Sequence, residues 1–361
     1  MKKLAFTCFI LLINCNTSKN LDFKKKFVQN NSELSELFDN NEIQLKLTVI
    51  DERKGFKEYE YNVDSEKYFY PASTVKLPIA LFALEKLNEH KNLSIDTPFM
   101  LEDDTLKTTI RRELEKIFIL SDNQANNRLF EFLGQDYINN QLISKGFNNA
   151  RIFHRLSTSN SSKLKSKRVD FFLKDSMISF QNDNQIVNKL NLKNLKKGVG
   201  YINSEDTMVN NSMDFSYKNF ISIDNLHKII KILFFPENFN EANRFNLTKK
   251  QKELVFKYMS GYPKEFGYDS EEYPYFFNKF FIYGDEELQF SDSFKIYNKV
   301  GLAYGQLTDT ALIIKDGKSI ILTATINVNT NGIYNDDLYD YDSVGFPFLA
   351  QVSREILKNI N

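Results

Sequence analysis

A serine and a lysine stand three residues apart in the stretch YPASTVKLPI, as Ser73 and Lys76. The apolar residues among 75–84 predict a buried helix face that begins beside this pair. Residues three apart on a helix share a face, so the lysine could take the proton of the serine hydroxyl. The alternative is an ordinary helix start, with a capping serine and a solvated lysine. A second S-x-x-K match at 162–165, in a polar loop, shows that this motif alone does not decide.

Two further motifs accompany the first. Ser121-Asp122-Asn123 stands directly before an amphipathic helix pattern, and Lys299-Val300-Gly301 lies on an expected strand near the C-terminus. The K-x-G pattern is weak alone, because it recurs at 196–198 and 315–317. The order and setting of the three motifs are more specific: S-x-x-K on a helix, S-D-N before a helix and K-x-G on a late strand.

The three motifs in this order resemble those of the class A serine β-lactamases and the related penicillin-recognising enzymes. The resemblance spans residues 21–361 and includes ASTVKLPIALFALEKL and SDNQANNRLFEFLG. Closer still are lipoprotein serine hydrolases of Bacteroidetes, suggested by MDFSYKN, NKVGLAYG and YNDDLYDYDSVGFPF. The resemblance implies an α/β (α+β) fold of the β-lactamase/transpeptidase type and a substrate that is a small molecule or derives from peptidoglycan.

The resemblance also implies roles for four catalytic side chains. Ser73 attacks a carbonyl to form an acyl-enzyme, and neutral Lys76 accepts its proton. Ser121 relays a proton towards the leaving group, and Lys299 supplies positive charge. The like charge of Lys299 and partial burial would both lower the pKa of Lys76.

Three further residues are implied in substrate binding. Asn123 binds the substrate amide, and the backbone N–H groups of Ser73 and Leu302, the residue after Gly301, form an oxyanion hole.

Two departures from the family pattern limit the comparison. Val300 replaces the hydroxyl residue of K-T-G, which holds the substrate carboxylate; losing such a bond costs about 1.5–3 kcal/mol. The glutamate that activates the deacylating water is not found after Arg155-Leu156, and Glu205, the only glutamate between 154 and 214, is expected to be a surface acid. We also expect His154 and Arg155 to make strand or loop contacts.

These departures keep three interpretations open. The first is a β-lactamase-like hydrolase that turns β-lactams over slowly. The second is a D-Ala-D-Ala-type peptidase or penicillin-binding protein, since such enzymes manage without that glutamate. The third is a non-catalytic surface lipoprotein that binds cell-wall fragments, although the five polar residues of the three motifs argue against it.

The elements that must position these residues follow from periodicity. Alternating apolar residues predict a β-hairpin over 43–63 and three strands at 294–305, 308–317 and 318–329. Helices are predicted from Phe23 to before Asn40 and over 347–360. Strands at both ends imply one antiparallel sheet of about five strands built from both termini and flanked by helices. The expected organisation is a sheet lobe, about 23–70 and 285–361, and a mostly helical lobe, about 71–284, within one hydrolase domain, 23–361.

The N-terminus resembles a bacterial lipoprotein signal. A short basic start precedes an apolar run of about ten residues, too short to span a bilayer, and then Cys15. We expect a signal peptide over 1–14, lipid attachment at Cys15 and a tether over 15–22; a plain secretory signal is the alternative. The mature chain would then be exported and held at a bacterial envelope membrane, periplasmic or surface-facing, by its lipid anchor only.

Composition narrows the remaining partners. The 361 residues include 47 basic and 47 acidic side chains, so no net charge favours nucleic acid. The only cysteines are Cys8 and Cys15, and the three histidines lie far apart in the chain. We therefore expect no disulfide, no metal site and no cofactor. We expect a monomer.

Overall fold

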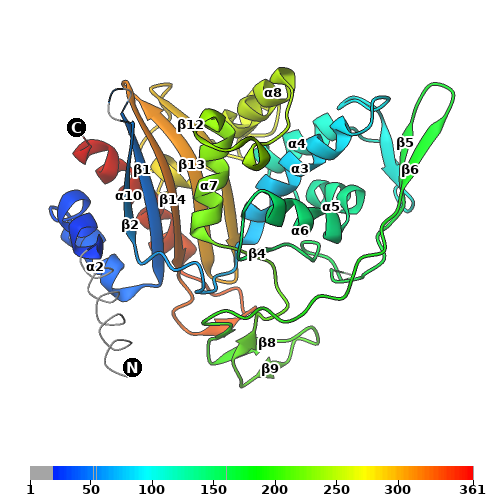
Figure 1. Ribbon diagram of the computed structural model, residues 1–361. Coiled ribbons are helices and arrows are strands. Elements are labelled where there is room, and N and C mark those ends of the chain that lie inside the picture. Colours follow the sequence, from blue (N-terminus) through cyan, green and yellow to red (C-terminus); the bar gives the residue numbers. More distant parts are fainter. Residues whose placement is uncertain (1–18, 52, 54, 160, 361) are drawn as a thin grey trace, which may run out of the picture.

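The centre of the molecule is a five-stranded antiparallel sheet in the order β12-β13-β14-β1-β2 (Figure 1). The computed structural model describes residues 19–51, 53, 55–159 and 161–360. The strands are β1 (Ile43–Asp51), β2 (Gly55–Tyr61), β12 (Phe294–Ala303), β13 (Gln306–Lys315) and β14 (Lys318–Asn327). β1 pairs with β14 in a register that places Ile43 opposite Ile326. The prediction of one sheet made from both ends of the chain is confirmed.

Helices cover both faces of this sheet (Figure 1). On one face, Leu45 and Leu47 of β1 share a buried apolar cluster with residues of α2 (Ser32–Asn40) and α10 (Phe346–Asn359). On the other face, the Thr48 hydroxyl lies 2.8 Å from His227 Nε2 of α7 (Ile223–Phe234). Burial on both faces explains why β13 and β14 are almost continuously buried.

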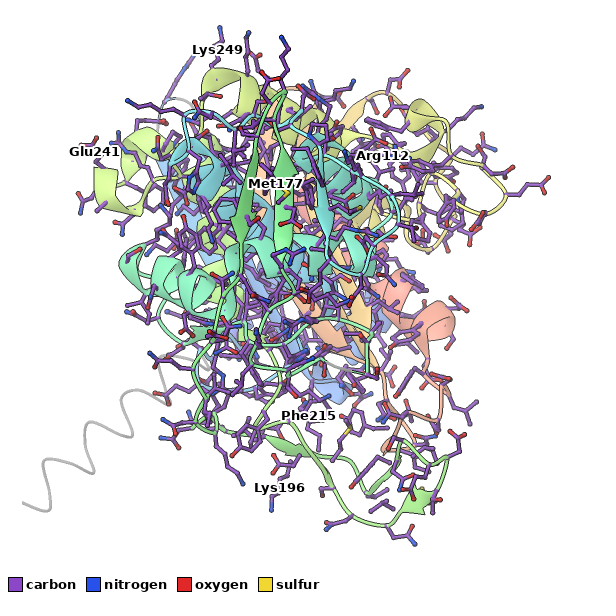
Figure 2. The ribbon with its side chains drawn as sticks, turned by 90° about the vertical axis from the view of Figure 1, so that its right-hand side faces the viewer. Arg112, Met177, Lys196, Phe215, Glu241 and Lys249 are labelled. Carbon is purple, nitrogen blue, oxygen red and sulfur yellow. The ribbon has the colours of Figure 1, made fainter. Side chains whose placement is uncertain are left out.

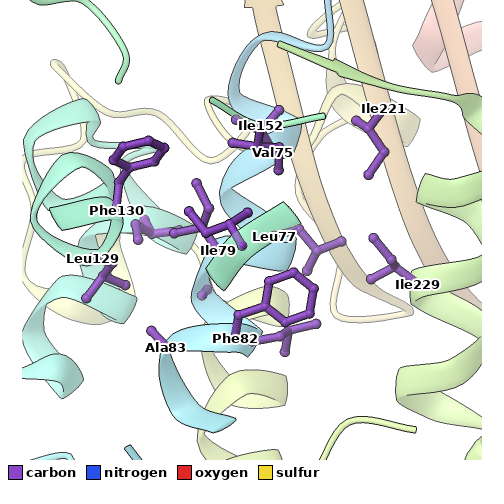
Figure 3. Close-up of a cluster of buried hydrophobic side chains, with 14 of the residues drawn as sticks. Val75, Leu77, Ile79, Phe82, Ala83, Leu129, Phe130, Ile152, Ile221 and Ile229 are labelled. Atoms are coloured by element: carbon purple, nitrogen blue, oxygen red, sulfur yellow. The ribbon is translucent and has the colours of Figure 1, made fainter. Parts of the chain in front are cut away.

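The helical part packs around α3 (Lys76–Asn88), whose residues from Lys76 to Leu87 are all buried. The sequence predicted one buried face, but neighbouring elements cover every side of this helix. Its neighbours include α4 (Ile110–Ile119), α5 (Asn123–Leu133) and α6 (Gln135–Ser144), and Asn88 at its end donates a hydrogen bond to Gln251 of α8 (Lys249–Ser260). Figure 3 shows part of this core, with labelled side chains from both sides of the cluster: Val75, Leu77, Ile79, Phe82, Ala83, Leu129, Phe130, Ile152, Ile221 and Ile229.

The prediction of a single helix from Phe23 to Asn40 is wrong. The described residues 19–27 are helical, the chain turns at 28–31, and α2 then begins anew. Asn31 caps α2, because its side chain accepts a hydrogen bond of 2.9 Å from Leu34 N–H. The C-terminal helix is confirmed as α10.

Several short elements were not predicted. Figure 2 shows Met177 on the hairpin that faces away from the N-terminal helices. The short strands are β3 (Phe99–Leu101), β4 (Ala150–Arg151), β5 (Val169–Phe172), β6 (Met177–Phe180), β7 (Lys196–Lys197), β8 (Gly200–Ile202), β9 (Met208–Val209), β10 (Met213–Asp214), β11 (Phe220–Ile221) and β15 (Ile333–Tyr334). The short helical turns are Ala72–Val75, Pro236–Asn238, Glu241–Asn243, Pro263–Phe266, α9 (Phe280–Tyr283) and Tyr341–Gly345.

The expected signal peptide and Cys15 lie outside the described residues. Within the described part of the chain, no helix is long and apolar enough to cross a membrane.

Candidate active site

The structure brings Ser73 and Lys76 into direct contact. Ser73 lies in the helical turn Ala72–Val75 that leads into α3, and Lys76 Nζ donates a hydrogen bond of 2.8 Å to Ser73 Oγ. Lys76 is fully buried, and neither this turn nor α3 has a side-chain cap. The alternative of a capping serine and a solvated lysine therefore does not describe this helix start.

Two residues of the S-D-N motif accept hydrogen bonds from the same lysine. Lys76 Nζ also donates to Asn123 Oδ1 at 2.7 Å and to the Ser121 carbonyl oxygen. Ser121 has a left-handed backbone, with φ 54°, and Asp122 caps α5 by accepting from Ala125 N–H at 2.6 Å. The strained turn and the cap together aim the loop at Lys76.

The environment of Lys76 favours its neutral form. Burial is the main cause that lowers its pKa well below the ordinary value, and the nearby positive charge of Lys299 lowers the pKa further. Asp122 opposes both effects. A neutral lysine beside a serine hydroxyl is able to accept the hydroxyl proton.

Lys299 of β12 reaches the site from the sheet. Its Nζ donates to Ser121 Oγ at 2.7 Å and to the carbonyl oxygen of Val300 at 2.9 Å. Ser121 Oγ also lies 3.4 Å from Lys76 Nζ, so this hydroxyl connects the two lysines. Burial lowers the pKa of Lys299 to about 7.

Gly301 is required by the close approach of β12 to the nucleophile turn. A Cβ atom at this position would lie 2.7 Å from the Pro71 carbonyl oxygen and 3.0 Å from the Thr74 backbone nitrogen. No side chain fits between the two backbones at that separation. The glycine of K-x-G therefore lets the edge strand lie against the turn that holds Ser73.

The register of β12 directs the Leu302 N–H towards the same turn. A two-residue turn joins Ala303 to Gln306, so Ala303 of β12 and Gln306 of β13 form a hydrogen-bonded pair. Hydrogen-bonded and non-bonded pairs alternate, which places Leu302 in a non-bonded pair with its N–H pointing away from β13. β12 is the edge strand, so this N–H has no strand partner, and Leu302 lines the same cavity as Ser73.

A cavity of about 420 Å³ opens beside the nucleophile. Ser73, Ser121 and Asn123 contribute to its lining, together with Gly301 and Leu302. All seven residues to which the resemblance gave catalytic or binding roles thus lie in or next to this cavity.

A buried polar group lies near Lys299, and the sequence did not predict it. The Asp309 carboxylate of β13 accepts hydrogen bonds from Asn298 Nδ2 at 2.9 and 3.0 Å and from Phe281 N–H at 3.1 Å. Lys279 Nζ donates to the Met259 and Gly261 carbonyl oxygens at 3.1 and 3.2 Å.

Burial dominates the titration of this group. It raises the pKa of Asp309 to about 6 and lowers the pKa of Lys279 to about 7. Asp309 favours the charged form of Lys299, whereas Lys279 opposes it. A charged residue inside the apolar strand QLTDTALIIK was a sequence signal for this group.

The loop after His154 is held by structural contacts, as expected. The Arg155 guanidinium pairs with the buried Glu131 carboxylate at 2.8 Å. His154 Nε2 accepts from Asn219 N–H at 3.1 Å, and burial lowers the pKa of this histidine to about 4.

The same loop brings Ser157 to the site, which the sequence did not predict. Asn123 Nδ2 donates to Ser157 Oγ at 2.9 Å. Glu205 is exposed in the turn between β8 and β9 and does not line the cavity, in agreement with the prediction of a surface acid. The described residues bring together no group of three His, Cys, Asp or Glu side chains that could hold a metal ion.

Comparison with known proteins agrees with this geometry. Residues 30–188 match the model of the β-lactamase enzyme family. None of the curated proteins matches the chain.

Solved β-lactamase structures share the fold across nearly the whole chain. The β-lactamase of Burkholderia phymatum is 13% identical, with a TM-score of 0.56 over 95% of this chain and 100% of its own. The enzyme of Sphaerobacter thermophilus is 13% identical, with a TM-score of 0.55 over 91% and 96%. The class A β-lactamase of Mycobacterium abscessus is 14% identical, with a TM-score of 0.54 over 91% and 97%. Residues 30–188 are thus similar to the β-lactamase enzyme family, and the solved structures show that the chain has the β-lactamase fold.

Proposed function

We propose that the protein is a serine hydrolase that forms an acyl-enzyme on Ser73. The observation that carries this proposal is the hydrogen bond of 2.8 Å between Lys76 Nζ and Ser73 Oγ inside a buried site that favours neutral lysine. A nucleophile needs its base within hydrogen-bond reach, which this distance provides, and burial together with Lys299 shifts Lys76 towards the proton-accepting form.

The acylation step uses the groups in this order. Ser73 Oγ attacks the substrate carbonyl carbon while its proton passes to Lys76 Nζ. The carbonyl oxygen becomes an oxyanion that accepts hydrogen bonds from the N–H groups of Ser73 and Leu302. Collapse of this intermediate breaks the bond to the leaving group, which takes a proton from Ser121 Oγ; Lys76 restores that proton.

Deacylation consumes one water molecule. The water oxygen adds to the acyl carbonyl, the bond to Ser73 Oγ breaks, and the products are a carboxylic acid and free Ser73. The loop after Arg155-Leu156 supports slow turnover of β-lactams, because it presents the Ser157 hydroxyl to Asn123 and not the glutamate that the resemblance leads us to expect there. Loss of a general base typically costs about 10²–10⁴-fold in rate.

Intact-protein mass spectrometry with a fluorescent penicillin and an acylating phosphonate tests the proposal. We expect one covalent adduct on the wild type and none on Ser73→Ala. An equal adduct on Ser73→Ala, or none on the wild type, would refute it. A chromogenic cephalosporin tests the second part, since rapid multiple turnovers would contradict slow deacylation.

A D-Ala-D-Ala-type peptidase or penicillin-binding protein is the second candidate. The missing glutamate after Arg155-Leu156 favours this activity over that of a fast lactamase, because peptidases of this type manage without that residue. Release of D-alanine from a cell-wall pentapeptide, absent with Lys76→Ala, would support it. A non-catalytic role in binding cell-wall fragments would follow if Ser73→Ala and Lys76→Ala left every measurable phenotype unchanged.

We also propose that the chain is exported and anchored at a bacterial envelope membrane by lipid on Cys15. The basic start, the apolar run and the cysteine that follows it support this location. Labelling of growing cells with an alkynyl fatty acid should mark the wild type and not Cys15→Ala. Equal labelling of both proteins would refute the proposal.

A further inference from the structure

The cavity beside Ser73 has largely apolar walls. Four phenylalanine rings and two leucines contribute to its lining: Leu120, Phe276, Phe277, Phe280, Leu302 and Phe346. Phe280 and Phe346 pack edge to face, with ring centroids 4.8 Å apart, and Phe280 is buried. Packed rings resist collapse of the cavity, so a substrate group must fill this space by apolar contact.

The charged residues that line the cavity are all acidic. They are Asp285, Glu286 and Asp342, and the lining includes no lysine or arginine. Asp285 is neutralised, because Arg354 Nη1 donates to its carboxylate at 2.8 Å. Glu286 and Asp342 are exposed and form no ion pair with any described basic residue within 4.0 Å. Two negative charges therefore remain at the cavity.

The positive groups of the site do not compensate for these charges. Lys299 Nζ is directed to Ser121 Oγ and to the Val300 carbonyl oxygen. Val300, a buried residue of the cavity lining, has a side chain with no hydrogen-bond donor. A substrate carboxylate placed here would lose water without gaining a partner.

We propose that this cavity selects esters or amides that place an uncharged apolar group of aromatic size in it, and that it rejects substrates that place a carboxylate there. The inference rests on acylation of Ser73, the proposed function. The relevant substrates are thus acyl compounds with a phenyl or bulky aliphatic group and no carboxylate within reach of Glu286 and Asp342.

Matched p-nitrophenyl esters test the inference. The acylation rate constant is measured by the nitrophenolate burst for the phenylacetate, acetate and hemiglutarate esters, with the site of acylation verified against Ser73→Ala. Burial of a phenyl ring favours phenylacetate over acetate by about tenfold or more. Hemiglutarate, which carries a carboxylate, should be the slowest of the three.

The charge contribution is isolated by Glu286→Gln/Asp342→Asn. Two exposed charges within ~10 Å of the substrate carboxylate should together repel it by about three- to tenfold at low salt. The ratio of the acylation rate constants, hemiglutarate over phenylacetate, should rise by that factor in the variant. The rise should be smaller in about 0.5 M salt, because salt screens exposed charges. Glu205→Gln/Asp206→Asn is the matched control, because it makes the same charge change in the exposed β8–β9 turn.

The outcomes separate the two proposals. Hemiglutarate acylating Ser73 as fast as phenylacetate, or an equal rise in the ratio for the control variant, would overturn the selectivity while leaving the nucleophile intact. If no ester acylated Ser73, the proposed function itself would fail, and the selectivity with it.

Discussion

Gly301→Ala should separate the two backbone segments that carry the proposed oxyanion donors. The added Cβ would lie 2.7 Å from the Pro71 carbonyl oxygen, where ordinary contact begins at 3.4 Å. β12 or the turn that holds Ser73 must therefore move by about 0.7 Å. The moving segments carry the N–H groups of Leu302 and Ser73, so the separation between the two donors should widen.

The expected cost is much larger for catalysis than for folding. Overpacking of this kind costs about 1–3 kcal/mol of stability. Misplacing one oxyanion donor costs about 10²–10³-fold in rate. We expect the variant to fold, to lose a few degrees in Tm, and to be acylated about 100-fold more slowly or worse.

The assay is stopped-flow acylation by a fluorescent penicillin, together with thermal unfolding. Gly317→Ala is the control, because Gly317 has φ +77° and no atom within 4 Å of an added Cβ. It should cost about 1 kcal/mol through backbone strain and leave the acylation rate unchanged. Thr74→Ser in the Gly301→Ala background should not restore activity, because the contacts with Pro71 oxygen and Thr74 nitrogen are to backbone. A folded Gly301→Ala protein acylated within threefold of the wild-type rate would refute the reasoning.

Three further predictions concern the surroundings of the site. Val300→Thr keeps the side-chain shape and adds a hydroxyl, so penicillin acylation should rise by about 10- to 100-fold; an unchanged rate would show that the hydroxyl does not reach the substrate carboxylate. Burial lowers the pKa of Lys279 to about 7 from 10.5, so between these values the unfolded chain holds a proton that the folded chain has released. The free energy of unfolding should therefore rise with pH across this window, by up to about 1.4 kcal/mol per pH unit from this lysine. In urea unfolding at about pH 7 to 9, Lys279→Met should reduce the slope of the unfolding free energy against pH by the amount that corresponds to about one proton. An unchanged slope would contradict the assignment. Arg155→Met leaves Glu131 buried without its partner, so it should cost about 3–5 kcal/mol in denaturant unfolding; a loss below ~1 kcal/mol would show that the pair is not needed.

The main architecture was predictable because it depends on periodicity. Ten-residue strands of alternating or continuous apolar residues, such as β13 and β14, are long enough to show their pattern in sequence. Two-residue strands such as β7 and β10 contain too few residues for any period. The break at 28–31 was missed because the apolar spacing on either side of it fits one helix, and only the Asn31 cap marks the second start.

The candidate site was predictable where short motifs carry it. The order of three motifs predicted the meeting of Ser73, Ser121 and Lys299, which the structure places together. The contact between Asn123 and Ser157 depends on the path of a loop without regular structure, so no local pattern reveals it. The Lys279 ammonium and the Asp309 carboxylate are brought together only by the fold, and their burial depends on distant segments.

The pairing of β1 with β14 has a consequence for the order of folding. The nucleophile turn and α3 are made early during synthesis, but the sheet cannot close until β14 is available to pair with β1. Closing a loop of about three quarters of the chain, from Thr48 to Ile321, is slow, because the entropy of so many residues is lost before the contact forms. A nascent chain that lacks its last segments would also lack β12 and hence the Lys299 ammonium and the second oxyanion donor. The reactive serine thus remains inert until the C-terminal strands have joined the sheet.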